Sequence, residues 1–437
     1  MLRTRSNAEM RAPIASRPAP PRDSFMMRHR AGASAPQTAA MKIEASPRGV
    51  DKTRPVVLAL LEVLWPGNDA TGPNQSFLEL CRSLGDEFVF KAVARDRPFG
   101  STLAVAPVGV WFEREFAKVR YCPVSVFGAA GLAEILRTTS YDVLMMNGFF
   151  DRDFTIPALT LRRFGRVPQR PTILSPRGEF SRGALALNSG RKHCYLALAR
   201  RLGLLEDVWL HATGPCEAED IARAFPHGRG IFVAPNVRRP TPAPAVRTVA
   251  KREGTLRLAF LGRVARVKNL DYALRVLRSV ERPVSFDIFG PLQDGDYLRE
   301  CLAIAADLPG HISVAFKGEI RNELVSQTLA DCDLFFLPTR GENFGHAILD
   351  ALLAGVPVLI SDRTPFQSLE LKGAGWSLSL DAPERFAEAI EAFAAMSPEK
   401  AATMRAAARE LGERSILESD AVAANRAMLH SALGHMR

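Results

Sequence analysis

Short apolar runs alternate with amphipathic segments from residue 54 almost to the end of the chain. Residues 55–61 and Leu334–Leu337 are continuous apolar runs, and Leu256–Leu261 is apolar except for Arg257, as is typical of strands buried on both faces of a parallel sheet. Each run leads into a polar loop and then into a segment with apolar residues at helical spacing. Strands that alternate with helices in this way predict an α/β fold with parallel sheets.

The same alternation continues through both halves of the chain. We expect further strands at residues 88–94, 108–112, 142–146, 172–174, 207–213, 231–236, 285–289, 312–316 and 356–360. We expect helices at residues 75–84, 129–138, 191–204, 218–225, 270–280, 346–354, 383–396, 398–411 and 416–433. A chain of 437 residues is too long for one ordinary core, so these elements are expected to form two domains.

Changes in composition place the domain boundaries. Residues 54–236 are predicted to form a first Rossmann-like domain and residues 255–412 a second. Between them, residues 237–254 carry several prolines among basic residues and read as a linker. Residues 413–437 are expected to form a terminal helix that packs back on the first domain.

The first 53 residues have no hydrophobic period. Residues 1–50 hold nine Lys and Arg against three acids, which is +6 of the net charge of +10, in a stretch rich in Pro, Ala and Ser. Such a composition predicts a disordered basic segment, with Met41 as an alternative start. The rest of the chain is only about +4, which gives no reason to expect nucleic acid as a partner.

Composition also limits the compartment. The chain is 47% hydrophobic and 24% charged, as is typical of a globular protein, and it has no apolar run of the ~20 residues that cross a membrane. Its six cysteines are scattered, without a CxxC pair, and are expected to be free thiols in a reducing cytoplasm.

Candidate chemistry centres on the stretch from Leu334 to Ile360. Gly341 and Gly345 bracket Glu342-Asn343-Phe344 between a predicted strand and a predicted helix. The N-terminus of a helix beside a glycine turn can bind an anion, but a carboxylate there would repel phosphate. The position of Glu342 therefore favours chemistry on a sugar.

Two motifs in the second half resemble retaining family 4 (group 1) glycosyltransferases of the bacterial polysaccharide type. Glu342 and Asp350 resemble the E-x7-E signature of this family, except that the second acid is Asp instead of Glu. Gly262-Arg263 with Lys268, after a predicted strand, resembles the G-R-x4-K motif. Two fixed cations there would offset the charge that develops on a diphosphate leaving group.

The resemblance implies the GT-B fold, in which two Rossmann-like α/β domains face each other across a cleft. It implies retaining transfer of a sugar, of the hexosyl type, from a nucleotide-sugar donor to an acceptor hydroxyl without a metal or another cofactor. In this family the first acid, here Glu342, orients the transferring sugar. The donor-binding residues that it implies are Arg263 and Lys268 for the diphosphate, Asn343, Phe344 and Gly345 for sugar or phosphate, Asp350 for the ribose, Glu319 and Ile320 for the base, and Gly72 in a loop that faces the cleft.

The first domain offers Arg177 in the loop Ser-Pro-Arg-Gly-Glu, where many family members have a cleft histidine. Arg177 either holds a donor or acceptor oxyanion, as a catalytic residue, or pairs with Glu179 to cap the loop. His211, on a predicted strand, is interpreted as a core histidine.

Two further acidic pairs resemble the D-x-D metal motif of other transferases. Asp331 and Asp333 flank Cys332 just before a predicted strand, and we interpret them as a helix-to-strand turn. Asp151 and Asp153 are discounted in the same way, so no metal ligand is predicted.

The resemblance implies a role in cell-surface polysaccharide or lipopolysaccharide synthesis. The expected acceptors are sugars, lipid-linked sugars or polysaccharides, and the expected location is the cytoplasm, with peripheral contact at the inner face of the plasma membrane. Two other functions stay open. One is a phosphorylase or nucleotide-sugar epimerase of similar fold, and the other is a non-catalytic nucleotide-sugar binder.

Overall fold

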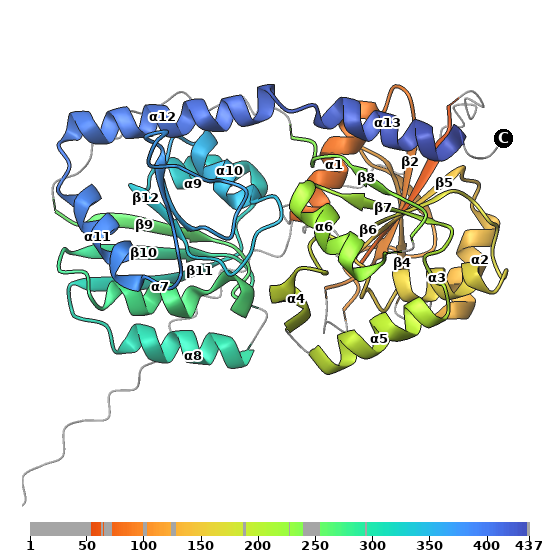
Figure 1. The fold of residues 1–437 in the computed structure, drawn as a ribbon, viewed down its shortest axis with the longest axis horizontal. Coiled ribbons are helices and arrows are strands. Elements are labelled where there is room, and N and C mark those ends of the chain that lie inside the picture. Colours follow the sequence, from red (N-terminus) through yellow and green to blue (C-terminus); the bar gives the residue numbers. More distant parts are fainter. Residues whose placement is uncertain are drawn as a thin grey trace, which may run out of the picture. The chain divides into compact units, whose positions relative to one another are not determined.

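The computed structural model describes residues 54–62, 64, 72–98, 103–123, 128–186, 189–226, 228–238, 254–292 and 295–434. The predicted disordered segment 1–53 and most of the predicted linker lie outside these ranges. Within them the chain forms two sheets, each flanked by helices (Figure 1). This confirms the expected α/β fold of two Rossmann-like domains.

The first sheet has the strand order β3-β4-β2-β1-β5-β6-β7-β8. Its strands are β1 (Val56–Leu61), β2 (Val89–Arg95), β3 (Trp111–Glu113), β4 (Lys118–Cys122), β5 (Val143–Asn147), β6 (Thr172–Ser175), β7 (Val208–Ala212) and β8 (Ile231–Val233). All neighbouring pairs are parallel except β3 with β4. Its helices are α1 (Gly72–Leu84), α2 (Ala129–Thr138), α3 (Thr155–Arg163), α4 (Arg182–Ala186), α5 (Ser189–Arg201) and α6 (Pro215–Ala224).

The second sheet has the order β11-β10-β9-β12-β13-β14, and all its pairs are parallel. Its strands are β9 (Leu256–Leu261), β10 (Val284–Phe289), β11 (Ile312–Gly318), β12 (Leu334–Leu337), β13 (Val358–Ser361) and β14 (Gly375–Leu378). The helical elements of this half are η2 (Arg266–Lys268, a 3₁₀ turn), α7 (Leu270–Leu277), α8 (Gly295–Ala306), α9 (Asn322–Ala330), α10 (His346–Leu353), α11 (Pro383–Ala394) and α12 (Pro398–Leu417), and α13 (Ala421–Gly434) follows.

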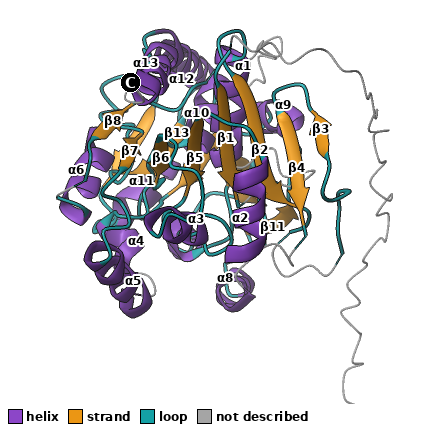
Figure 2. Cartoon of the chain, turned by 90° about the vertical axis from the view of Figure 1, so that its right-hand side faces the viewer, coloured by secondary structure: helices purple, strands orange, loops and turns teal. Residues whose placement is uncertain are grey.

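Strand β1 shows how the first sheet is buried on both faces. Its residues alternate between two apolar clusters, with Leu58 and Leu60 on the side of α2 and α3 and Val57, Ala59 and Leu61 on the side of α1. Figure 2 shows these helices on opposite sides of the sheet. Because successive side chains of a strand point to opposite faces, a continuous apolar run is what such a double burial requires.

The terminal helix α13 packs on the first sheet. Met428 and Leu429 are buried in the same cluster as Phe77 of α1, and Asn425 donates a hydrogen bond to the Pro235 carbonyl (2.8 Å). The preceding helix α12 packs on the second half of the chain instead, where a Cβ on Gly412 would approach the Leu353 nitrogen to 2.9 Å.

Several elements differ from the sequence-based expectation, and strand β14 and helices α3, α4, α8 and α9 were not predicted at all. Strand β4 was not expected, because Lys118 and Arg120 give it an alternating pattern instead of an apolar run. Helix α1 begins at Gly72, within the predicted loop, and α12 continues to Leu417. Among the described residues, no helix combines the length and the apolar character needed to cross a membrane.

Both sheets have a point where the strand order reverses, and this positions the candidate site. In the first sheet, β2 lies on one side of β1 and β5 lies on the other. In the second sheet, β10 lies on one side of β9 and β12 lies on the other. Open α/β sheets bind ligands at the carboxyl ends of the strands beside such a reversal. Asn147 ends β5, the loop with Arg263 and Lys268 follows β9, and the Glu342 turn follows β12.

Candidate active site

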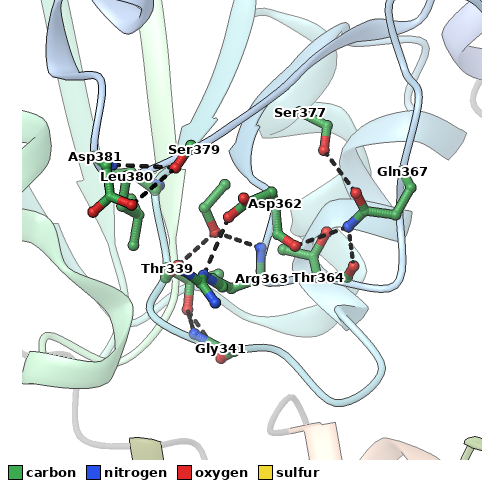
Figure 3. A network of polar contacts seen from close by, with 12 residues as sticks. Thr339, Gly341, Asp362, Arg363, Thr364, Gln367, Ser377, Ser379, Leu380 and Asp381 are labelled. Carbon is green, nitrogen blue, oxygen red and sulfur yellow. Dashed lines mark hydrogen bonds and ion pairs between the residues drawn. The ribbon is translucent and has the colours of Figure 1, made fainter. Parts of the chain in front are cut away.

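The Glu342 turn is held by the loops on either side of it. Ser361, at the end of β13, donates a hydrogen bond to the Thr339 carbonyl (2.5 Å), and the Thr339 hydroxyl bonds the Gly341 carbonyl (3.0 Å). The Glu342 amide donates to the Arg363 carbonyl (2.9 Å). Figure 3 shows Thr339, Gly341 and Arg363 within this polar network. The backbone at Glu342 is therefore fixed before any ligand binds.

Gly345 ends the turn in a conformation that other residues rarely adopt. Its φ is 78°, and it caps the N-terminus of α10. A Cβ there would lie 3.2 Å from both the Ile348 and the Phe366 side chains. Glycine is thus required by both backbone conformation and space.

Glu342 and Lys268 form an ion pair, which joins the two motifs of the second half. The side chains are 12% and 19% exposed. Asn269 brings the loops together, because its amide donates to the Pro338 carbonyl (2.9 Å) and accepts from Arg340 (2.9 Å). Glu342 and Lys268 are 74 positions apart in the sequence. They come together because the strands that precede them, β12 and β9, are neighbours in the sheet.

Arg263 lies in the same loop as Lys268 but is exposed. No hydrogen bond or ion pair involves its guanidinium within the described ranges. Its charge therefore remains available to an anion that approaches the loop.

Arg177 is bound to two asparagines and not to Glu179. Its Nε donates to Asn147 Oδ1 (2.8 Å) and its Nη1 to Asn236 Oδ1 (2.6 Å). The Glu179 carboxylate instead accepts the amides of Phe149 and Phe150. The alternative in which Arg177 pairs with Glu179 is therefore wrong. Burial lowers the pKa of Arg177, and the charge of Glu217 acts in the opposite direction.

Glu217, which the sequence analysis did not select, connects the first domain to the Glu342 turn. Its carboxylate, in a residue that is 3% exposed, accepts hydrogen bonds from the Gly178 amide (2.6 Å), the Thr213 amide (2.7 Å), the Thr213 hydroxyl (2.8 Å) and Asn343 Nδ2 (2.7 Å). Burial opposes its ionisation, but these hydrogen bonds outweigh burial and lower its pKa. The side chain of Asn343 therefore already has hydrogen-bond partners in the protein. The resemblance implies that the backbone of Asn343, and not this side chain, binds sugar or phosphate. The one sequence signal for this role of Glu217 is its position as an acid in the first turn of α6.

Asp350 faces Arg238 at the start of the predicted linker. Arg238 donates one guanidinium nitrogen to Asp350 and another to Gln75 of α1, and Gln75 bonds Asn322 of α9 (2.6 Å). Burial raises the pKa of Asp350, and the charge of Arg238 opposes this. The shorter acid of the signature therefore already has a cationic partner in the structure.

His346, the first residue of α10, packs against α1. Its Nε2 lies 3.1 Å from the Ser76 hydroxyl, and a Cβ on Gly72 would lie 2.8 Å from its ring. Gly72 is thus placed beside the end of the Glu342 turn. Burial lowers the pKa of His346 well below its ordinary value, and the charges of Arg238, Arg177 and Lys268 lower it further. The lowered pKa favours the neutral form of this imidazole.

The remaining candidate residues have simpler surroundings. Phe344 packs its ring on His346, with centroids 4.5 Å apart. Glu319 is exposed and Ile320 is partly buried against the second core, in the loop after β11. In the described part of the chain no hydrogen bond or ion pair connects Glu319 to the Glu342 turn.

The acidic pairs and His211 have structural roles. Asp333 accepts hydrogen bonds from the backbone and the guanidinium of Arg257 (2.9 and 3.0 Å), so the interpretation as a helix-to-strand turn is confirmed. Asp151 accepts three amides at the start of α3. His211 is a core histidine as expected, bonded to Ser175 (2.7 Å) and to the Ala234 carbonyl (2.8 Å).

Carboxyl groups near the ends of β1 and β5 are difficult to ionise. Burial raises the pKa of Glu62 to about 8, and the charges of Asp151, Asp153 and Glu179 add to this effect. Burial also raises the pKa of Glu179 to about 7. Both values lie above the ordinary 4.5, so the folded chain holds more protons than the unfolded chain between about pH 5 and 8.

We expect the melting temperature to fall as pH rises from about 6.5 to about 8, because over this range the folded state holds more protons than the unfolded state and rising pH favours unfolding. Each ~1 kcal/mol lost corresponds to about 2–4 °C for a chain of this size. Burial lowers the pKa of His211 to about 4, so this histidine affects stability only below its ordinary 6.5. Differential scanning calorimetry should show a smaller fall for Glu62→Gln and an unchanged one for the exposed control Glu113→Gln. A flat wild-type profile would contradict the expectation.

One family model matches part of the second half of the chain. Residues 245–411 match the family model described as "Glycosyl transferases group 1". This segment contains Arg263, Lys268, Glu342 and Asp350. A search of curated proteins gave no match.

Solved structures share the fold across most of the chain. Sucrose-phosphate synthase from Thermosynechococcus elongatus has a TM-score of 0.64 and 14% identity, over 88% of this chain and 100% of that chain. Anabaena Alr3699/HepE in complex with UDP and glucose has a TM-score of 0.64 and 16% identity, over 86% and 99%. WaaG, a glycosyltransferase involved in lipopolysaccharide biosynthesis, has a TM-score of 0.58 and 15% identity, over 85% and 98%. The chain therefore has the GT-B fold of these proteins, and residues 245–411 in its second half match the group 1 glycosyltransferase model.

Proposed function

We propose that the protein is a retaining glycosyltransferase that moves a hexosyl group from a nucleotide-sugar donor to an acceptor hydroxyl. The observation that carries the proposal is the pairing of Glu342 with Lys268 at the carboxyl ends of β12 and β9. This pairing supports the proposal because a carboxylate suited to sugar hydroxyls lies beside a cation suited to phosphate, within the segment that matches group 1 glycosyltransferases. The Anabaena neighbour, solved with UDP and glucose, supports a nucleotide-sugar donor.

The ion pair suggests how the donor is recognised. A diphosphate that binds Arg263 and Lys268 competes with Glu342 for the lysine, because each cation forms charge-assisted hydrogen bonds with phosphate oxygens. The carboxylate thus released accepts hydrogen bonds from the hydroxyls of the sugar. As the sugar leaves, the two cations offset the charge on the diphosphate, and the leaving phosphate takes the acceptor proton.

The acceptor and the pathway are proposed from the resemblance and from WaaG. We infer a carbohydrate acceptor, free, lipid-linked or part of a polysaccharide, in the synthesis of a cell-surface polysaccharide or lipopolysaccharide. Such a reaction takes place in the cytoplasm or at the inner face of the plasma membrane.

Binding and turnover with UDP-, GDP- and ADP-sugars test the proposal directly. We expect one nucleotide class to bind preferentially and NMR of the product to show an anomeric configuration equal to that of the donor. Activity should be unchanged after exhaustive EDTA treatment, since Arg263 and Lys268 supply the positive charge. Phosphate-dependent cleavage, epimerised donor, or tight binding without turnover on any acceptor would each overturn the proposal.

Asp350→Asn is expected to weaken ribonucleotide binding about tenfold, because a hydrogen bond to a charged group contributes roughly 1.5–3 kcal/mol. If Asp350 holds the ribose, 2′-deoxyribonucleotides should bind equally well to the wild type and the variant. An equal loss for both nucleotide types would show that Asp350 serves only to anchor Arg238. Calorimetric titration measures both affinities, and Arg409→Gln, which removes an ion pair on α12, is the control.

A further inference from the structure

Arg177 is a cation whose charge no bonded partner neutralises. Its two hydrogen-bond partners, Asn147 and Asn236, are neutral amides. Its third nitrogen, Nη2, makes no hydrogen bond with the described residues. The nearby carboxylate of Glu217 is saturated by Gly178, Thr213 and Asn343. The charge of a buried arginine that only stabilised the fold would be expected to be compensated by a bonded carboxylate.

Asn147 adds an unused donor beside this cation. It is 9% exposed and ends β5, at the reversal of the first sheet. Because a guanidinium can only donate, the amide oxygen of Asn147 must face Arg177. The amide nitrogen, Nδ2, is therefore the atom that does not bond Arg177. That buried Nδ2 has no hydrogen-bond partner within the described ranges. A buried donor without an acceptor is unfavourable by about 1–3 kcal/mol, so an acceptor atom from a ligand or a water molecule would stabilise it.

The backbone of this loop is in an uncommon conformation at the same residue. Arg177 has a φ of 58°, which is uncommon for a residue with a side chain. Such a conformation is unfavourable by about 1–3 kcal/mol and is found most often at functional sites. It directs the guanidinium to the two asparagines while Gly178 continues the loop.

The neighbours of Arg177 place it beside the reaction centre. A Cβ on Gly178 would lie 3.4 Å from the Asn343 Cβ, in the turn that carries Glu342. The diphosphate cations, Arg263 and Lys268, belong to the other sheet. An anion on Arg177 would therefore be held from the first domain, next to the turn whose Glu342 would hold the sugar.

We propose that Arg177 and Asn147 bind an oxyanion of the acceptor, a carboxylate or a phosphate close to the accepting hydroxyl. The inference rests on the proposed transferase function and narrows its acceptor to an acidic or phosphorylated sugar. A planar guanidinium with free N–H groups matches either oxyanion. Neutral sugars would leave its charge uncompensated.

Titration of the protein saturated with its preferred nucleotide tests the inference. The probes are glucose 6-phosphate, glucuronate and glucose, which are alike in size and differ in charge. We expect one anionic probe to bind at least tenfold more tightly than glucose, and the stronger of the two identifies the anion as phosphate or carboxylate. Equal affinity for all three would overturn the inference.

Variants separate the acceptor site from the donor site. Arg177→Gln and Asn147→Leu should abolish the preference for the anionic probe and leave the Kd of the nucleotide-sugar within twofold of wild type, whereas Arg177→Lys should retain part of the preference. Arg162→Gln, which removes a buried arginine bonded to the Arg170 carbonyl (2.9 Å), is the matched control and should keep it. If Arg177→Gln instead weakens nucleotide-sugar binding, Arg177 serves the donor and the inference is wrong. If no nucleotide binds the wild type, the proposed function itself has failed.

Discussion

Glu342→Ala is expected to lower the rate of sugar transfer by at least ~100-fold, a loss of about 2.7 kcal/mol of transition-state stabilisation. The carboxylate is the only part of the turn that this substitution removes, because the hydrogen bond from the Glu342 amide to Arg363 is made by the backbone. The lost ion pair with Lys268 is partly exposed and should contribute no more than about 1 kcal/mol to folding. Nucleotide affinity should be unchanged or higher, since Lys268 no longer has a competing partner.

Steady-state kinetics and calorimetric titration measure these effects separately. Glu391→Ala is the control, because that carboxylate of α11 accepts the amide of Glu281 (2.6 Å) away from the site. A Glu342→Ala variant that keeps more than about a tenth of the wild-type kcat would falsify the catalytic role of this acid.

Lys268→Met is expected to lower kcat/KM by ~100-fold or more, because it removes a fixed cation from the leaving diphosphate. One charge-assisted hydrogen bond contributes roughly 1.5–3 kcal/mol, and the loss also leaves Glu342 without its partner next to phosphate. The two effects act in the same direction. Arg263→Met should reduce kcat/KM as well, since its exposed guanidinium would reach the same group.

Arg266→Met tests whether the position of the charge matters. Arg266 lies in the same 3₁₀ turn as Lys268, but it pairs with Glu300 (3.0 Å) and packs on Tyr297. We expect its substitution to change kcat/KM less than threefold, a difference of under about 0.7 kcal/mol. Equal losses for Arg266→Met and Lys268→Met would indicate a general electrostatic effect, and recovery of Lys268→Met activity to the wild-type level with Mg²⁺ would contradict a specific role for the lysine.

The sequence determined the second half of the protein more fully than the first. Apolar runs such as Leu334–Leu337 identify strands buried on both faces, and Gly345 follows from a turn that needs a positive φ. The spacing within each pair, Arg263 with Lys268 and Glu342 with Asp350, is a local property of one segment that follows a strand, so a linear pattern can reveal it. The antiparallel edge formed by β3 and β4 carries no such run, and only part of it was predicted.

Contacts between distant segments were decided by the tertiary structure alone. Arg177 has a carboxylate two positions away in the sequence, yet the backbone at φ 58° directs its guanidinium to Asn147 and Asn236, which lie 30 and 59 positions away. Glu217 looks like an ordinary acid in the first turn of a helix, and only folding brings it to Asn343. The sequence thus determined which elements form and which local motifs they carry, because periodicity and turn chemistry act over a few residues. The partner of each buried charge was left to the tertiary structure, because that choice depends on which strand ends meet when the sheets assemble.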